Sequence, residues 1–338
     1  MKAMVLRAPC DLALDDVAPP QVPAGHVLVR ITHSGLCGTD SKIYKGAIPA
    51  QYPLIMGHEM VGEVVSAANG RIRLGGGRVI IDPVLYCGAC FHCRIGQTNL
   101  CPAGGLIGRE TNGGFAEYAA VPASQIFQLP DSVDSTCAPL IQVATTCLHA
   151  QRLAQLSRGE SVAVIGLGVS GQLHVQLAKA RDAGKVIGIS RSRFKNDLAK
   201  QLGADVVIES GPSAVATVLD ETGGRGADVV IECTGVMTSI ADAIRMARFG
   251  GRIILFGISN ATSGTLPFYD LYFKELTLIN NRAATAQDFP VMIDLVDRGA
   301  VRLEPLVTHR MALEELRTAL AMVEDGAERR LKIILDHT

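Results

Sequence analysis

The stretch Ser161-Val162-Ala163-Val164-Ile165-Gly166-Leu167-Gly168-Val169-Ser170-Gly171 decides the fold of this 338-residue chain. Its first five residues form a run of the kind found in strands buried on both faces of a parallel sheet. The G-x-G-x-x-G spacing that follows predicts a tight turn into a helix, with the helix N-terminus facing a pyrophosphate. We expect Gly166, Gly168, Val169 and Gly171 to bind a dinucleotide. A glycine turn without a ligand is the alternative.

Downstream of this stretch, apolar strands alternate with helical patterns. A helical period runs from Gly171 to Ala183, and the alternation predicts a doubly wound α/β domain with a parallel sheet over residues 146–282. We expect its strands at 161–165, 185–190, 204–208, 228–232, 252–256 and 276–279.

The first 145 residues have a different, β-rich texture. Val27–Ile31 and Gly62–Val65 have the composition of strands, and Pro19-Pro20 and Gly75–Gly77 that of turns. After about residue 281 the β-rich texture partly returns, with a helix expected at 313–324 and a strand at 331–335. Residues 283–338 are therefore expected to rejoin the first domain.

Composition excludes several classes of function. The chain has 32 basic and 33 acidic residues, a net charge of −1, and so no electrostatic reason to bind nucleic acid or an acidic membrane. No apolar run reaches the length of a membrane span, and the first 16 residues lack a signal-peptide core. We expect a cytoplasmic protein, in which nine cysteines indicate metal binding or catalysis rather than disulfides.

Four cysteines have the spacing of a metal loop. Cys87, Cys90, Cys93 and Cys101 form C-x2-C-x2-C-x7-C among glycines and prolines. Four thiolates suit tetrahedral zinc, and a site closed by four protein ligands is structural because it leaves no open position. An iron–sulfur cluster and a chance grouping of free thiols are the alternatives.

A second group contains one cysteine, one histidine and one carboxylate. Cys37 lies in Gly35-Leu36-Cys37-Gly38-Thr39-Asp40, and His58 and Glu59 lie in Gly57-His58-Glu59-Met60-Val61-Gly62. Each motif alone is weak, since a lone cysteine is usually a small core residue. Together they form a reasonable zinc ligand set with water in the remaining position.

The order of these motifs resembles the zinc-containing medium-chain alcohol/polyol dehydrogenase family, in particular its sorbitol and threonine dehydrogenase branches. G-x-C-G-T-D, G-H-E-x-x-G, the four-cysteine loop, the Gly113–Tyr118 stretch G-G-F-A-E-Y and the glycine-rich motif follow one another over nearly the whole chain. The resemblance implies a GroES-like β-rich catalytic domain (1–145 with 283–338) interrupted by a Rossmann domain (146–282).

The resemblance also assigns roles to residues. It implies that Cys37, His58 and Glu59 hold a catalytic zinc and that Gln142, seven residues before a histidine, supplies a further ligand through its amide oxygen or yields that place to water. Thr39 matches the hydroxyl that begins a proton relay. Lys42 stands where relatives often carry a histidine, which leaves the outer relay open; a solvated surface charge is the expected reading.

Cofactor choice depends on the end of the second strand of the parallel sheet. NAD-binding proteins carry an acidic residue there, whereas this chain has Ser190 followed by Arg191, Arg193 and Lys195. A hydroxyl and a guanidinium can hold a 2′-phosphate, so we expect NADP(H) in preference to NAD(H). Thr234, in the turn after the fourth strand, resembles the family's residue beside the nicotinamide.

These observations predict a dehydrogenase with two zinc ions per chain, one catalytic and one structural. The expected reaction is hydride transfer between NADP(H) and a small secondary alcohol or polyol and its ketone. An aldose 1-dehydrogenase and a threonine-type amino-alcohol dehydrogenase are alternatives within the enzyme class. A non-catalytic nucleotide-binding structural protein is the alternative outside it. A homo-oligomer, a tetramer rather than a dimer, is expected from the resemblance.

Overall fold

The computed structural model describes residues 1–67, 77–259, 261–325 and 329–337, which form two compact units. Unit 1 comprises Met1–Val143, Thr285–Asp297 and Leu303–Thr338, and unit 2 comprises Ala144–Ala284 and Arg298–Arg302. The chain thus leaves unit 1 and returns to it. The domain boundaries expected from the sequence, 145/146 and 282/283, stay a prediction.

Unit 2 is built on a six-stranded sheet with the order β13-β12-β11-β14-β15-β16. All neighbouring strands run parallel, and the order reverses at β11, as in the doubly wound dinucleotide-binding fold. The predicted α/β class is confirmed. The strands are β11 (Ser161–Ile165), β12 (Lys185–Ser190), β13 (Val206–Glu209), β14 (Ala227–Glu232), β15 (Ala247–Leu255) and β16 (Thr277–Asn280).

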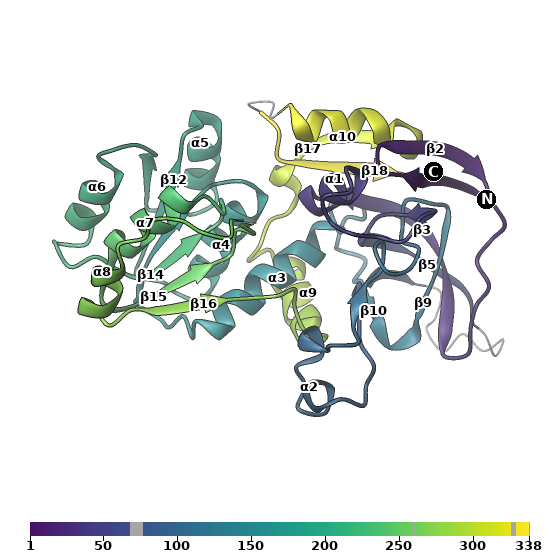
Figure 1. Cartoon of the computed structure of the whole chain (residues 1–338), viewed down its shortest axis with the longest axis horizontal. Helices are drawn as coiled ribbons and strands as arrows, with labels where there is room; N and C mark the ends of the chain where they lie inside the picture. Colours follow the sequence, from purple (N-terminus) through teal and green to yellow (C-terminus); the bar gives the residue numbers. More distant parts are fainter. Residues whose placement is uncertain (68–76, 260, 326–328, 338) are drawn as a thin grey trace. The chain divides into compact units, whose positions relative to one another are not determined.

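Helices cover both faces of this sheet (Figure 1). Val162 and Val164 of β11 belong to one apolar core with residues of α3, α4 and α5, whereas Ala163 and Ile165 belong to a second core with α6 and α7. Both faces of the strand are therefore buried, which explains its continuous apolar run. The helices are α3 (Leu140–Leu153), α4 (Val169–Ala180), α5 (Arg193–Gln201), α6 (Ala214–Glu221), α7 (Met237–Met246) and α8 (Phe268–Phe273).

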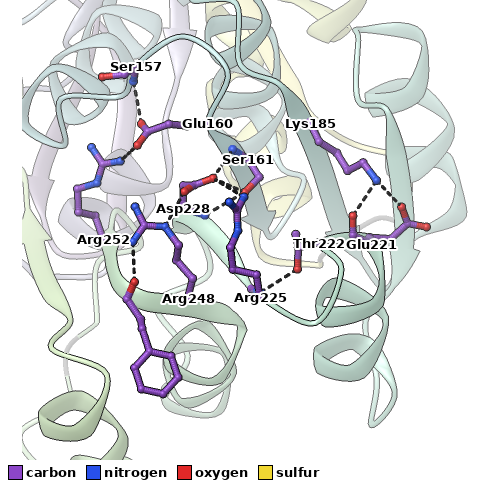
Figure 2. Close-up of polar contacts among 12 residues, drawn as sticks. Ser157, Glu160, Ser161, Lys185, Glu221, Thr222, Arg225, Asp228, Arg248 and Arg252 are labelled. Carbon is purple, nitrogen blue, oxygen red and sulfur yellow. Dashed lines mark hydrogen bonds and ion pairs between the residues drawn. The ribbon is translucent and has the colours of Figure 1, made fainter.

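One carboxylate joins the amino ends of three neighbouring strands (Figure 2). Asp228 of β14 accepts hydrogen bonds from the Ser161 backbone N–H (2.8 Å) and hydroxyl (2.6 Å) of β11 and from Arg248 Nε of β15 (2.6 Å). Burial alone would raise the pKa of Asp228, but these bonds outweigh it and lower the pKa to about 2. At the end of the sheet opposite the glycine turn, the strands are thus joined by a carboxylate that stays ionised at neutral pH.

Unit 1 is rich in β-structure, as predicted. Its largest sheet has seven strands in the order β10-β6-β5-β3-β18-β17, with β9 also paired to β3. β1, β2 and β4 form a second sheet, and β7 pairs with β8. The strands are β1 (Lys2–Ala8), β2 (Asp11–Asp16), β3 (His26–Leu36), β4 (Leu54–Ile55), β5 (Glu59–Ala67), β6 (Arg78–Ile81), β7 (Val84–Leu85), β8 (Gly105–Leu106), β9 (Tyr118–Pro122), β10 (Ile126–Gln128), β17 (Val307–Ala312) and β18 (Lys332–Asp336).

The long strand β3 organises this unit. Its first half pairs with β9, its last four residues pair with β18, and its other edge pairs with β5. Segments from the two ends of the sequence therefore meet on either side of Gly35. The helices of unit 1 are α1 (Gly38–Tyr44), α2 (Phe91–Arg94), α9 (Asp288–Asp297) and α10 (Leu316–Glu324), with 3-10 turns η1 (Thr98–Leu100), η2 (Ala123–Gln125), η3 (Glu304–Leu306) and η4 (Leu313–Glu315).

Some elements begin or end away from their expected limits. The helix expected from Gly171 starts at Val169, because Gly168 already stands in extended backbone as its N-cap. The helix expected over 313–324 begins as the separate 3-10 turn η4 before α10 continues it. Of the turn expected at Gly75–Gly77, residues 75 and 76 lie outside the described residues.

Asp82 is a buried carboxyl group just before β7. Its Oδ1 accepts the Val84 N–H at 3.0 Å, and its Oδ2 has no hydrogen-bond partner in the described part of the chain. Burial raises the pKa of Asp82 to about 7, the Val84 bond opposes this, and the negative charge of buried Asp288 adds to it. Since an ordinary aspartate has a pKa of about 4, folding favours the protonated form.

This shift predicts a pH-dependent stability. Between about pH 4 and pH 7 the unfolded chain releases the Asp82 proton while the folded chain keeps it, so the free energy of unfolding falls as pH rises. Asp82→Asn is neutral at every pH and should remove this loss. Its advantage over the wild type should grow from near zero at pH 4 to about 4 kcal/mol above pH 7, measured by denaturant unfolding.

The matched control is Asp16→Asn, because Asp16 is exposed at the end of β2. Its difference from the wild type should stay flat across the same pH range. An Asp82→Asn advantage that does not grow with pH would contradict the buried, protonated state of Asp82.

Candidate active site

Three of the side chains predicted to bind metal lie together in unit 1. Cys37 is the N-cap of α1, and His58 and Glu59 lie where the chain enters β5. The Cys37 sulfur, a His58 ring nitrogen and a Glu59 carboxylate oxygen all lie within 4.8 Å of one another. The pairing of Gly35 with Glu59 between β3 and β5 sets this proximity.

Asp40 orients two of these side chains. Its Oδ1 lies 3.2 Å from His58 Nδ1, and its Oδ2 accepts the Cys37 backbone N–H at 2.9 Å. Burial lowers the pKa of His58, but the Asp40 carboxylate and the Cys37 sulfur outweigh burial and leave the pKa well above its ordinary value. The sequence argument did not assign Asp40 a role, although its position three residues after the N-cap is that of a capping box.

Glu59 has a buried counter-ion that the sequence argument missed. The Lys332 ammonium, on the first residue of β18, forms an ion pair with Glu59 Oε2. Both side chains are almost fully buried. The available signal was a single lysine inside the apolar run Leu331–Leu335.

The charges of this cluster fit a divalent cation. Binding of a metal requires Cys37 as a thiolate and His58 as a neutral ring. In that state the negative charges of Cys37, Asp40 and Glu59, less the positive charge of Lys332, leave the cluster with two net negative charges. Buried charge of this size is costly unless it is compensated. A thiolate, an imidazole nitrogen and a carboxylate oxygen are also the donor types that zinc prefers.

The other expected residues of this site are placed as follows. Thr39 is the second residue of α1 and is half-buried, and Lys42 follows one turn later, also half-buried. Gln142 lies in the first turn of α3 with 8% of its surface exposed. Its role as a zinc ligand, like that of Thr39 in a proton relay, stays a prediction.

The four cysteines of the metal loop converge on one point. Sulfur–sulfur distances are 3.5 Å for Cys90–Cys93, 3.9 Å for Cys90–Cys101 and 4.0 Å for Cys87–Cys93. Tetrahedral zinc with bonds of about 2.3 Å requires sulfurs about 3.8 Å apart. Hydrogen bonds from the Ala89 and Cys90 backbone N–H groups lower the pKa of Cys87 to about 6, whereas burial and the neighbouring thiols raise the pKa of Cys93 to about 12. The donors therefore fit a closed four-thiolate site.

In unit 2, the glycine motif forms the connection between β11 and α4. Gly166 has a positive φ of +90°, and a Cβ there would lie 2.6 Å from Thr234 Cγ2. A Cβ on Gly171 would overlap the carbonyl oxygen of Gly166. Gly168 differs, because a Cβ on it would meet no atom within 4 Å. Gly166 and Gly171 are thus needed by the fold, whereas Gly168 leaves open space beside the helix N-terminus.

The neighbouring strand ends carry the other expected cofactor residues. Ser190 ends β12, and its hydroxyl accepts the Ser192 N–H at 3.2 Å. Arg191 and Arg193 are exposed at the start of α5, where Arg193 lies 3.9 Å from Asp197, and Lys195 is half-buried. This group is net basic and includes no carboxylate at position 190.

Glu232 shapes the turn that contains Thr234. Its carboxylate, fully buried at the end of β14, accepts the backbone N–H groups of Thr234 (2.7 Å) and Gly235 (2.9 Å) and the Thr234 hydroxyl. Thr234 itself is exposed and packs against the Gly166 turn. Glu232 is therefore a structural support for the turn that contains Thr234.

Comparisons with known proteins agree with both units. Residues 23–131 match the alcohol dehydrogenase GroES-like domain, and residues 168–298 match the zinc-binding dehydrogenase domain. The chain is 30% identical to D-arabitol-phosphate dehydrogenase of Enterococcus avium over 99% of its own length and 97% of that protein. The chain belongs to the zinc-containing medium-chain alcohol/polyol dehydrogenase family. It is a zinc-dependent, NAD(P)-linked oxidoreductase.

Two solved structures illustrate how the family binds cofactor. A zinc-binding dehydrogenase from Sinorhizobium meliloti bound to NADP is 31% identical, with a TM-score of 0.92 and 99% of each chain covered. An alcohol dehydrogenase from Escherichia coli with NADH is 30% identical, with a TM-score of 0.92 and 100% and 99% of the two chains covered. Family membership thus leaves the choice between NADP and NAD open. In the described part of the chain, no helix is both long and apolar enough to cross a membrane.

The glycine geometry predicts different consequences for two alanine substitutions. Gly171→Ala should destabilise the cofactor-free protein, because the new Cβ would overlap the Gly166 backbone. The melting temperature measured without cofactor should fall by several degrees. Gly168→Ala should leave the apo melting temperature within about a degree while weakening dinucleotide binding at least about tenfold, because the alanine methyl occupies the space for the pyrophosphate.

Thermal melts and fluorescence titration with dinucleotide measure the two effects. Equal losses of apo stability in both variants, or wild-type cofactor affinity in Gly168→Ala, would contradict this division of roles.

Proposed function

We propose that this enzyme transfers hydride between NADP(H) and a small secondary alcohol or polyol and the corresponding ketone. The single observation that supports this most directly is the convergence of Cys37, His58 and Glu59 within 4.8 Å, with His58, Glu59 and the neighbouring Asp40 buried. The family relation adds the cofactor chemistry, and the open donor set of three distinguishes this cluster from the closed four-cysteine loop.

Two zinc ions per chain are part of the proposal. Cys37, His58 and Glu59, with Gln142 or water, would hold the catalytic ion, and Cys87, Cys90, Cys93 and Cys101 the structural one. A zinc ion in the first site supplies Lewis acidity that polarises the substrate oxygen. All nine cysteines are free, which suits a reducing compartment, and we place the enzyme in the cytoplasm.

The protein's own residues prepare the site for proton and hydride transfer. Asp40 faces His58 Nδ1, which leaves Nε2 as the nitrogen available for a metal. The Thr39 hydroxyl, two residues after Cys37, is proposed to accept the proton that leaves the substrate hydroxyl. Lys42 is assigned no part in this transfer; we propose that it is a solvated surface charge.

Ser190, Arg191, Arg193 and Lys195 support the preference for NADP(H). An acidic residue in place of Ser190 would repel a 2′-phosphate, whereas a hydroxyl and nearby cations bind it by charge-assisted hydrogen bonds. Arg191 is exposed directly after the strand. Lys195 lies in the first turn of α5, where positive charge and the helix dipole act together on an anion.

Activity and metal content test the function together. We expect two zinc ions per chain by elemental analysis and nicotinamide-linked turnover that is highest with a secondary alcohol or polyol among alcohols, polyols, aldoses and threonine. Thr39→Val should lower turnover by about 100-fold and leave the zinc content unchanged. Turnover confined to aldoses or to threonine would overturn the substrate class, and an unaffected Thr39→Val variant would remove Thr39 from the mechanism.

The cofactor preference has its own test. Ser190→Asp should raise the KM for NADP at least about tenfold and spare the KM for NAD, because the new carboxylate faces the 2′-phosphate. Ser213→Asp, at the exposed N-cap of α6, adds the same charge elsewhere in unit 2 and should change neither constant. A wild-type enzyme that is faster with NAD than with NADP at equal low concentration would overturn the preference.

We further propose a homotetramer, supported by two exposed apolar patches. On unit 2, α8, which comes before the edge strand β16 in the chain, exposes aromatic side chains. On unit 1, the four-cysteine loop exposes Phe91 and Ile95. Because closed oligomers bring identical patches together, two such patches per chain suit a tetramer with two kinds of interface. The α8 patch consists of Phe268, Tyr269, Tyr272 and Phe273.

Light scattering measures this assembly. We expect four copies of the 35.8 kDa chain, reduced to two by Tyr272→Glu, which places a charge in the α8 patch. A monomeric wild type would contradict the proposal, as would a Tyr272→Glu variant that remains a tetramer.

A further inference from the structure

The Glu59–Lys332 pair is a charge pair with very few other partners. Lys332 has 4% of its side chain exposed and Glu59 has none. Apart from the ammonium on Oε2, neither carboxylate oxygen of Glu59 has a hydrogen-bond partner in the described residues. Because a buried carboxylate needs a compensating charge, Lys332 is the group that sets both the position and the effective charge of Glu59.

Gly35 makes this contact possible. β3 lies between β5 and β18, with Gly35 paired to Glu59 on one side and to Ile334 on the other. A Cβ on Gly35 would clash with Glu59 Oε2 and would lie 2.9 Å from Lys332 Cε. The two side chains therefore meet across the middle strand, over the one position that has no side chain.

We infer that Lys332 is a positioning residue that restrains the binding of Glu59 to the catalytic metal. The inference rests on the proposed function, since it concerns the ion proposed at Cys37 and His58. Lys332 engages Oε2, which leaves Oε1 as the oxygen available to a metal. The ammonium also withdraws negative charge from the carboxylate, so Glu59 is a weaker donor than an unpaired carboxylate would be.

The charge balance of the cluster gives this restraint a consequence. With Lys332 in place, a divalent ion brings the buried cluster to neutrality, and one position of the ion stays open to an exchangeable oxygen ligand. Without Lys332, Glu59 has no other charge partner than the metal. It should then bind the metal through Oε2 as well as Oε1, which slows metal release and crowds the position that the substrate oxygen needs.

Metal release and cobalt spectroscopy test the inference on the full chain. Zinc release to a chelator is followed in the wild type, and the kinetic phase absent from Cys37→Ser identifies the ion at this site. In Lys332→Met that phase should be at least about tenfold slower. The cobalt-substituted variant should show visible bands altered by an additional oxygen donor. Lys332→Arg keeps the charge and should restore both the wild-type release rate and the wild-type spectrum.

A second comparison separates this role from a structural one. In Glu59→Gln/Lys332→Met both charges are absent, so release should be no slower than in the wild type. If Lys332→Met does not fold, Lys332→Gln, which offers the carboxylate a neutral donor, should show an intermediate slowing.

The outcomes are distinct. A wild type with no ion at the Cys37 site would overturn the proposed function. A wild type that holds this ion, combined with unchanged or faster release and an unchanged cobalt spectrum in the Lys332 variants, would overturn only the inference about Lys332. Slow release that persists in the double variant would overturn it as well.

Discussion

The compensation of buried charge on either side of β3 is the constraint on which unit 1 depends. Asp40 and Glu59 place two carboxylates in an interior where water cannot screen them, and the half-buried Cys37 lies beside them. Lys332 answers one of these charges from the opposite neighbouring strand. This arrangement requires β5, β3 and β18 to be in register, because a shift of one residue would turn the side chains to the other face of the sheet. The same strand register therefore determines both the pairing of the sheet and the arrangement of the metal-binding side chains.

The candidate binding site of unit 2 differs from the charged cluster of unit 1. At the carboxyl end of β11 it offers backbone N–H groups and open space, created by glycines, rather than side-chain charge. Ionic side chains also support the strand ends: Asp228 joins three strands at the opposite end of the sheet, and Glu232 accepts backbone N–H groups of the Thr234 turn. The cofactor site proposed at this turn would therefore be formed largely by main chain.

The class of the fold and most of the residues of the candidate sites could be predicted from the sequence, because their signals are short local patterns. The glycine motif, the apolar strands of the parallel sheet and the spacing of the four cysteines are short patterns with one common structural solution. The proximity of Cys37 to His58 and Glu59 depended on the order of several motifs. Lys332 could not be found in this way, because its partner lies in a strand far away in the sequence. Asp82 was also missed, since only the folded structure shows how deeply it is buried.

The path of the chain has a consequence for the order in which the protein is made. Unit 2 is nearly continuous in sequence, so a ribosome finishes it while unit 1 still lacks β17 and β18. During that interval Glu59 has no lysine opposite it. The ion pair that compensates its buried charge can form only when β18, the last strand to be made, pairs with β3.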